Sequence, residues 1–306
     1  MKEGSTKVVV AALAGNSLIA IIKLAVALVT GSAALLAEGV HSVADTGNQV
    51  LLLVGLKRSQ RLPDAEHPFG YGHEQYFWAF VVALMLFFVG AVVSIYEGVE
   101  KLLEPHAIER PWLIYAILVA ALAIEAVSLT VALREFHRTR PRGLGYLAAI
   151  RASKDANLVV VLLEDTAALI GLLIALVGVG LAQLTGLMMF DALASVLIGL
   201  LLAGVAFMLA SETRSLLIGE AALAPHQERI RALAAAMPEV KSVEEVLTMH
   251  LGPRAILVGL RLDFRDDLVD RDLEAVIIDI KTRIHQAIPE VERILIESCR
   301  GPCGPG

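Results

Sequence analysis

Charged and aromatic residues are scarce in this sequence, and cysteine is almost absent. Only 19% of the 306 residues are charged, whereas 57% are hydrophobic and 5% aromatic. With a mean hydropathy of +0.69, this composition excludes a soluble protein, because several apolar runs reach the ~20 residues that span a bilayer. Cys299 and Cys303 are the only cysteines, so a disulfide framework and a four-thiolate metal site are excluded as well.

Several functional signatures are also missing. The net charge is -6, which does not suggest a nucleic-acid partner. A Gly-x-x-x-x-Gly-Lys-Ser/Thr loop is absent, which argues against an ATP-driven pump. The zinc-protease signature fails, because Phe77 follows His73-Glu74 where a second histidine is required. We therefore predict no catalytic residues, no enzyme activity and no cofactor.

The apolar runs predict an α-helical membrane protein with six transmembrane helices. The spans lie at about 8–30, 31–56, 75–96, 112–133, 158–181 and 190–210. The first follows Lys7 without a small-residue cleavage site, so we expect it to be retained. This gives a transmembrane domain over 1–219, a soluble domain over 220–298 and a Gly/Pro-rich tail over 299–306.

The soluble domain has the pattern of a small α+β fold. Apolar residues alternate from Ile256 to Phe264, which predicts a strand, and further strands are expected at 243–251 and 291–297. Helical spacing from Ile230 to Met237 and from Leu273 to Ile284 predicts two helices. The order α-β-β-α-β indicates a two-layer domain with its helices on one face of the sheet.

Lysine and arginine mark the orientation. They are concentrated in the second-to-third connection, beginning at Lys57, and in the fourth-to-fifth, from Arg134 to Lys154. Basic loops remain in the cytoplasm. An even number of spans then places both termini in the cytoplasm, and we expect a multi-pass protein of the cell (inner) membrane.

One polar row interrupts the second span. Four residues at helical spacing share one face: Glu38, His41, Asp45 and Asn48. An ionisable residue at bilayer depth costs on the order of 2.5 to 3.5 kcal/mol, so such a row needs a function or a partner. Imidazole nitrogen with carboxylate oxygen suits zinc and related metals. The alternative is that His41 and Asp45 only hydrogen-bond each other in a helix bundle.

Two further groups carry possible ligands. Glu164 and Asp165 form a second acidic cluster, inside the fifth span, and two helices with buried carboxylates can share a cation. In the loop after the second span, Asp64, His67 and His73 lie beside a Pro-Phe-Gly turn and suggest a loosely held metal. The alternative for the loop is that its histidines are merely solvated.

These motifs together resemble the cation diffusion facilitator family. The similarity rests on the His-x-x-x-Asp pair of the second span, the following His-Pro-Phe-Gly-Tyr-Gly-His loop, the six spans and the α-β-β-α-β tail. The resemblance implies a proton-coupled exporter of zinc or a related divalent ion, with a ferredoxin-like cytoplasmic domain that pairs two subunits. It also implies a transport site of His41, Asp45 and Asp165, and a loop site of Asp64 and His67.

The sequence departs from the family pattern at two of these positions. Val161 stands where the fifth span usually carries a second ligand, and Glu164 is the substitute, though about 100° away on an ideal helix. Tyr71 stands where the loop often has a histidine, which either weakens the loop site or transfers that role to His73. The acid-rich fifth span is similar to the branch related to the mitochondrial zinc transporter of animals.

We therefore expect a zinc/proton antiporter that exports the ion from the cytoplasm. Its expected partners are a divalent cation, the proton, membrane lipid and a second copy of the chain. A metal ligand set that contains histidine releases a proton on binding, and histidine titrates near ~6.5. The open alternatives are an exporter of manganese, iron or cadmium, and a metal-permeable channel.

Overall fold

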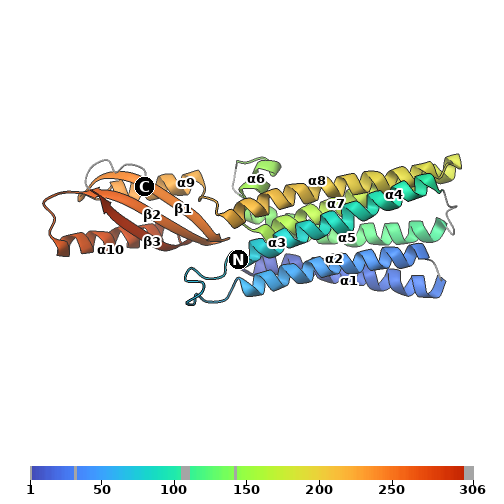
Figure 1. Ribbon diagram of the computed structural model, residues 1–306, viewed down its shortest axis with the longest axis horizontal. Helices are drawn as coiled ribbons and strands as arrows, with labels where there is room; N and C mark the ends of the chain where they lie inside the picture. Colours follow the sequence, from blue (N-terminus) through green and yellow to red (C-terminus); the bar gives the residue numbers. More distant parts are fainter. Residues whose placement is uncertain (1, 31–32, 105–110, 141–142, 300–306) are drawn as a thin grey trace. The chain divides into compact units, whose positions relative to one another are not determined.

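The chain forms two compact units in the computed structural model, which describes residues 2–30, 33–104, 111–140 and 143–299 (Figure 1). The helical unit comprises Met1–Arg58 and Glu74–Arg214. The C-terminal unit comprises Ser59–His73 and Ser215–Gly306. Some side chains of the first two helices, among them those of Glu38 and His41, lie outside the described part of the chain.

Long helices build the first unit. The third helix is continuous from α3 through a π-helical segment, η1, to α4, and a wide π turn of this kind often marks a functional position. The helices are α1 (Lys2–Thr30), α2 (Ala33–Arg58), α3 (Glu74–Met85), η1 (Leu86–Val92), α4 (Val93–Leu103), α5 (Pro111–Thr139), α6 (Tyr146–Ala152), α7 (Ala156–Thr185) and α8 (Met189–Ile218).

Four helices in the described part of the chain are long and apolar enough to cross a membrane. They are Glu74–Leu103, Trp112–Thr139, Ala156–Thr185 and Met189–Ile218. These confirm the last four of the six predicted spans. In α1 the described residues contain a shorter apolar helix, Thr6–Ile22, so the first two spans stay predictions, although α1 and α2 are themselves helices of 29 and 26 residues.

The start of α7 lies in the interior of the helical unit. Asp155 caps the helix, with its side chain accepting a hydrogen bond from the Leu158 N–H at 3.2 Å. Every residue from Ala156 to Leu162 is buried, and α1, α3 and α5 all contact α7. At the other end Gly186 adopts φ 74°, the left-handed conformation that ends many helices. The polar residues of α7 are therefore placed among other helices.

The C-terminal unit has the α-β-β-α-β order that the sequence predicted (Figure 1). The strands lie in the order β1-β2-β3, with β1 antiparallel and β3 parallel to β2. Both helices join one core with β2, so they cover the same face of the sheet. The elements are α9 (Ala224–Ala235), β1 (Val240–Gly252), β2 (Ala255–Phe264), α10 (Asp270–Ala287) and β3 (Val291–Cys299).

Candidate metal centre

The two acidic residues of α7 turn to different neighbouring helices. Glu164 and Asp165 are only 7% and 1% exposed, and consecutive residues on a helix project about 100° apart. Asp165 Oδ2 accepts a hydrogen bond from Ser128 Oγ of α5 at 2.7 Å. Glu164 faces α2, where Asn48 Nδ2 donates to its Oε1 at 3.1 Å and Gln49 Nε2 to its Oε2 at 2.9 Å. Each carboxylate is thus held by a different helix.

Two more acidic residues complete this cluster. Asp45 is half-buried on α2 and interacts electrostatically with both Glu164 and Asp165. Glu125 of α5 is buried and interacts with Glu164. Four acidic side chains from three helices therefore lie close together inside an apolar helical unit. A divalent cation offsets the repulsion and desolvation that such a cluster otherwise costs.

The structure describes only part of the ligand set that the sequence predicts. His41 lies on α2, four residues before Asp45, and its side chain is outside the described residues. Among the described side chains, no group of three or more histidine, cysteine, aspartate or glutamate residues is arranged to hold a metal. A metal site built from His41, Asp45, Asp165 and Glu164 therefore stays a prediction.

Sequence reasoning passed over three polar residues that the structure brings to this cluster. Glu125 and Ser128 lie inside an apolar span, and an acidic residue at such depth is itself a signal of function. Gln49 lies next to the polar row of α2 but off its face. Its role depends on the position of Glu164, which helical spacing along α2 does not reveal.

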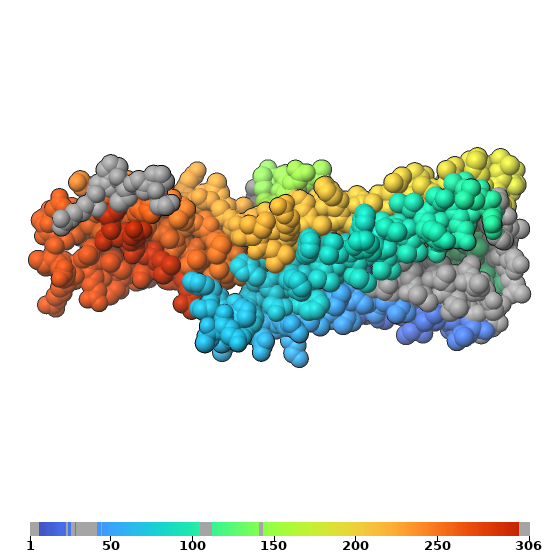
Figure 2. Space-filling model, viewed as in Figure 1, coloured from blue at the N-terminus to red at the C-terminus, as the bar shows by residue number. Residues whose placement is uncertain are grey.

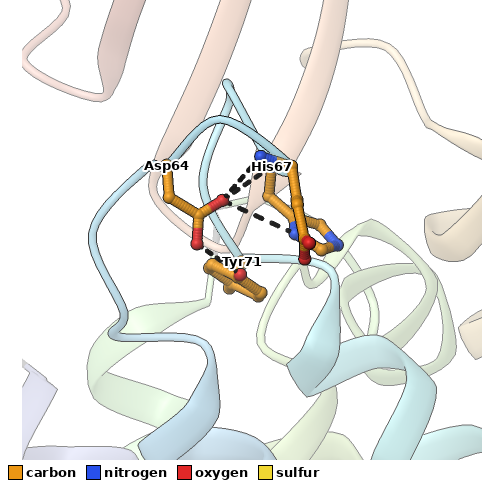
Figure 3. Close-up of polar contacts among 4 residues, drawn as sticks. Asp64, His67 and Tyr71 are labelled. Carbon is orange, nitrogen blue, oxygen red and sulfur yellow. Dashed lines mark hydrogen bonds and ion pairs between the residues drawn. The ribbon is translucent and has the colours of Figure 1, made fainter.

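The loop before α3 is organised around the carboxylate of Asp64 (Figure 3). Its Oδ1 accepts the backbone N–H groups of Glu66 at 3.0 Å and His67 at 2.8 Å, and its Oδ2 accepts the Tyr71 hydroxyl at 2.6 Å. The hydrogen bond from Tyr71, followed by that from the His67 N–H, lowers the pKa of Asp64. The same bond raises the pKa of Tyr71. The phenol of Tyr71, at a position where similar loops often have a histidine, thus donates a hydrogen bond to the carboxylate.

The third loop residue that we predicted as a ligand has a different partner. His73 Nε2 lies 3.1 Å from the carbonyl oxygen of His250 in β1, whereas His67 Nδ1 lies 3.8 Å from Asp64 Oδ1. In this arrangement the loop offers a metal two adjacent side chains, fewer than the four ligands of a closed structural zinc site. Metal binding by Asp64, His67 and His73 stays a prediction.

The loop packs on the C-terminal domain, as Figure 2 shows where light-blue side chains meet orange and red ones. The guanidinium carbon of Arg293 lies over the ring of Phe69, 5.7 Å from the centre of that ring. At Gly72 the two backbones approach closely, since a Cβ there would lie 2.0 Å from the Leu251 carbonyl oxygen. Only glycine fits such an approach. The contact between the loop and β1 therefore depends on glycine at position 72.

Long apolar helices that enclose a cluster of acidic side chains are the features of a helical membrane protein with charged groups in its interior. Residues 9–218 match the cation efflux transmembrane domain. The chain therefore belongs to the cation efflux family, also called the cation diffusion facilitators, whose members are transporters.

The relatives differ in the metal that their names give. The chain is 35% identical over 270 residues to the mitochondrial proton-coupled zinc antiporter SLC30A9 of Xenopus laevis, covering 88% of this chain and 48% of that protein. It is 31% identical to metal tolerance protein C4 of Arabidopsis thaliana, over 87% of this chain and 58% of that one. It is 24% identical to the manganese efflux system protein MneP of Bacillus subtilis, over 95% of each. The chain spans about half the length of the zinc antiporter.

The Asp64–Tyr71 bond predicts how the loop responds to acid. Because the folded-state pKa of Asp64 is lowered, its hydrogen bonds stabilise the loop above the ordinary aspartate pKa of ~3.9 and are lost as the pH falls through the lowered value. Tyr71→Phe removes the largest cause of that shift, so the loss should begin at higher pH. Hydrogen exchange over residues 59–73, corrected for intrinsic rates, measures this between about pH 3 and 5.

Tyr146→Phe, at an exposed tyrosine of the helical unit, is the matched control and should leave the exchange of the loop unchanged. Identical pH curves for wild type and Tyr71→Phe would contradict the assignment.

Proposed function

We propose that the protein is a zinc/proton antiporter that exports the ion from the cytoplasm. The observation that supports this function most is the acidic cluster of Asp45, Glu125, Glu164 and Asp165 inside the helical unit. The names of the relatives add zinc and proton coupling to it. The ion is the transported substrate, and the protein needs no cofactor and catalyses no covalent reaction.

In this proposal His41, Asp45 and Asp165 bind the ion. His41 and Asp45 lie one turn apart on α2, and Asp165 comes from α7. Nitrogen and carboxylate oxygen ligands suit zinc. Binding displaces a proton and release restores one, which couples the two fluxes. Rocking of helix groups about the site then gives alternating access.

The proposed topology follows the basic loops. With six spans, the connections that carry Lys57 and Arg134 face the cytoplasm, and the C-terminal unit lies on the same side of the cell membrane. We keep the division into a transmembrane domain (1–219), a ferredoxin-like cytoplasmic domain (220–298) and a tail (299–306).

The open face of the sheet supports a homodimer. Gly259 pairs with Leu247 on one side and Leu295 on the other, so these residues form a row on the face that α9 and α10 leave uncovered. The two leucines are 59% and 58% exposed. An apolar row on a small domain suits a self-complementary contact between two copies.

The first functional prediction concerns flux. Proteoliposomes with wild-type protein should accumulate zinc against its gradient when a pH gradient is imposed, whereas a channel would only equilibrate the ion. Asp45→Ala and Asp165→Ala should each abolish transport, because each removes an anionic ligand, while the protein still folds and inserts. Zinc uptake at the wild-type rate in either purified variant would remove that residue from the site.

The second functional prediction concerns the selectivity of transport between zinc and manganese. His41→Asp replaces the only nitrogen ligand with oxygen and makes the site harder, which favours manganese relative to zinc. It also removes a group that titrates near neutral pH. We expect residual transport, a higher manganese-to-zinc flux ratio and a shifted pH optimum, measured from about pH 5.5 to 8. An unchanged ratio and pH profile would show that His41 is not a ligand.

The third functional prediction concerns the proposed homodimer. Leu295→Glu places a charge in the apolar row, so the full chain in detergent should change from dimer to monomer in light scattering. Ile278→Glu is the matched control, since Ile278 of α10 is also 58% exposed but lies on a helix outside the open face. A monomeric wild type, or a Leu295→Glu variant that remains dimeric, would contradict the proposed interface.

A further inference from the structure

We propose that Glu164 is a positioning residue that joins α7 to α2 and thereby sets the spacing of Asp45 and Asp165, and is not itself a metal ligand. This inference rests on the proposed function, since it names a role at the same site. The supporting observation is a chain of hydrogen bonds that links Glu164 to α2 and α1.

The hydrogen bonds use both oxygens of Glu164. Oε1 accepts from Asn48 Nδ2 at 3.1 Å, and Oε2 accepts from Gln49 Nε2 at 2.9 Å. Gln49 Oε1 in turn accepts from Asn16 Nδ2 of α1 at 3.2 Å. All four side chains are buried. The chain of bonds therefore connects α1, α2 and α7 through the interior of the helical unit.

The location of this chain gives it an effect on the ion site. Asn48 and Gln49 come three and four residues after Asp45, so they lie one turn along α2 from that carboxylate. Glu164 directly precedes Asp165 on α7. A link between the amides and Glu164 therefore holds the two acidic groups that we propose as ligands at a defined separation.

The donors also match the acceptor. Both carboxyl oxygens of Glu164 accept hydrogen bonds, and the amide groups of asparagine and glutamine supply the donors. A buried amide without an acceptor destabilises the fold, so Asn48 and Gln49 require Glu164 as much as it requires them. Asp165 is different, since its described hydrogen bond comes from the hydroxyl of Ser128.

The same chemical change at three carboxylates tests this role. Glu164→Gln keeps the shape and one acceptor, and Gln49 and Asn16 can exchange the places of their amide oxygen and nitrogen to keep the chain of bonds. Zinc affinity, measured by equilibrium titration of the full chain in detergent, should stay within about threefold of wild type. Asp45→Asn and Asp165→Asn remove anionic ligands and should weaken binding at least about 100-fold.

A second variant breaks one of the two bonds between α2 and Glu164 without changing any carboxylate. Asn48→Leu leaves Glu164 with one donor and should weaken zinc binding by about tenfold, the effect of one lost buried hydrogen bond. Thr46→Val is the control on the same helix, because the hydrogen bond described for its hydroxyl goes to the Ser42 carbonyl oxygen of α2. It should leave zinc affinity unchanged. Melting temperature is measured beside affinity for every variant.

The outcomes separate the possible roles of Glu164. If Glu164→Gln loses as much affinity as Asp165→Asn, Glu164 is a ligand and the inference is wrong. If Asn48→Leu melts earlier but binds zinc as wild type does, the link is merely structural and the inference is equally wrong. A folded wild type that binds no zinc, with Asp45→Asn and Asp165→Asn indistinguishable from it, would remove the proposed function and the inference together.

Discussion

The cost of placing acidic side chains among apolar helices is the constraint on which the helical unit depends. Asp45, Glu125, Glu164 and Asp165 lie near one another in this unit, and each charge there must be hydrogen-bonded or paired. Glu164 receives two amide donors from α2, and Asp165 receives a hydroxyl from α5. These bonds compensate part of the cost of burying the two carboxyl groups.

The loop of the C-terminal unit is also organised around a carboxylate that accepts several hydrogen bonds. The Asp64 side chain is exposed, so solvent already stabilises its charge, and its hydrogen bonds serve to define the path of the loop. Tyr71 donates a hydrogen bond to the carboxylate, and the centre of its ring lies 4.2 Å from the centre of the His67 ring. Gly72 then allows close approach to β1. Membership of the cation efflux family therefore does not by itself determine how each position of the loop is used.

The C-terminal unit has two chemically different sides. The inward side chains of β2, such as Val258 and Leu260, are buried beneath α9 and α10. On the open face, Arg261 pairs with Glu245 at 3.1 Å and Glu297 at 3.3 Å, next to the row of Leu247 and Leu295. A charged row beside an apolar row orients a partner as well as attracting it, which agrees with the proposed pairing of two chains.

The sequence alone determined the last four apolar spans and the α-β-β-α-β order, because both depend on local periodicity that needs no knowledge of distant residues. It also located the acidic residues of α2 and α7 and the family. It left open which side chain each acid meets. Asn48 and Glu164 are 116 positions apart, and Tyr71 and Asp64 meet only because a turn brings them together. Such pairings arise when helices and turns pack in three dimensions. Only the tertiary structure therefore decided that Glu164 faces α2, that Asp165 faces α5 and that Tyr71 donates a hydrogen bond to Asp64.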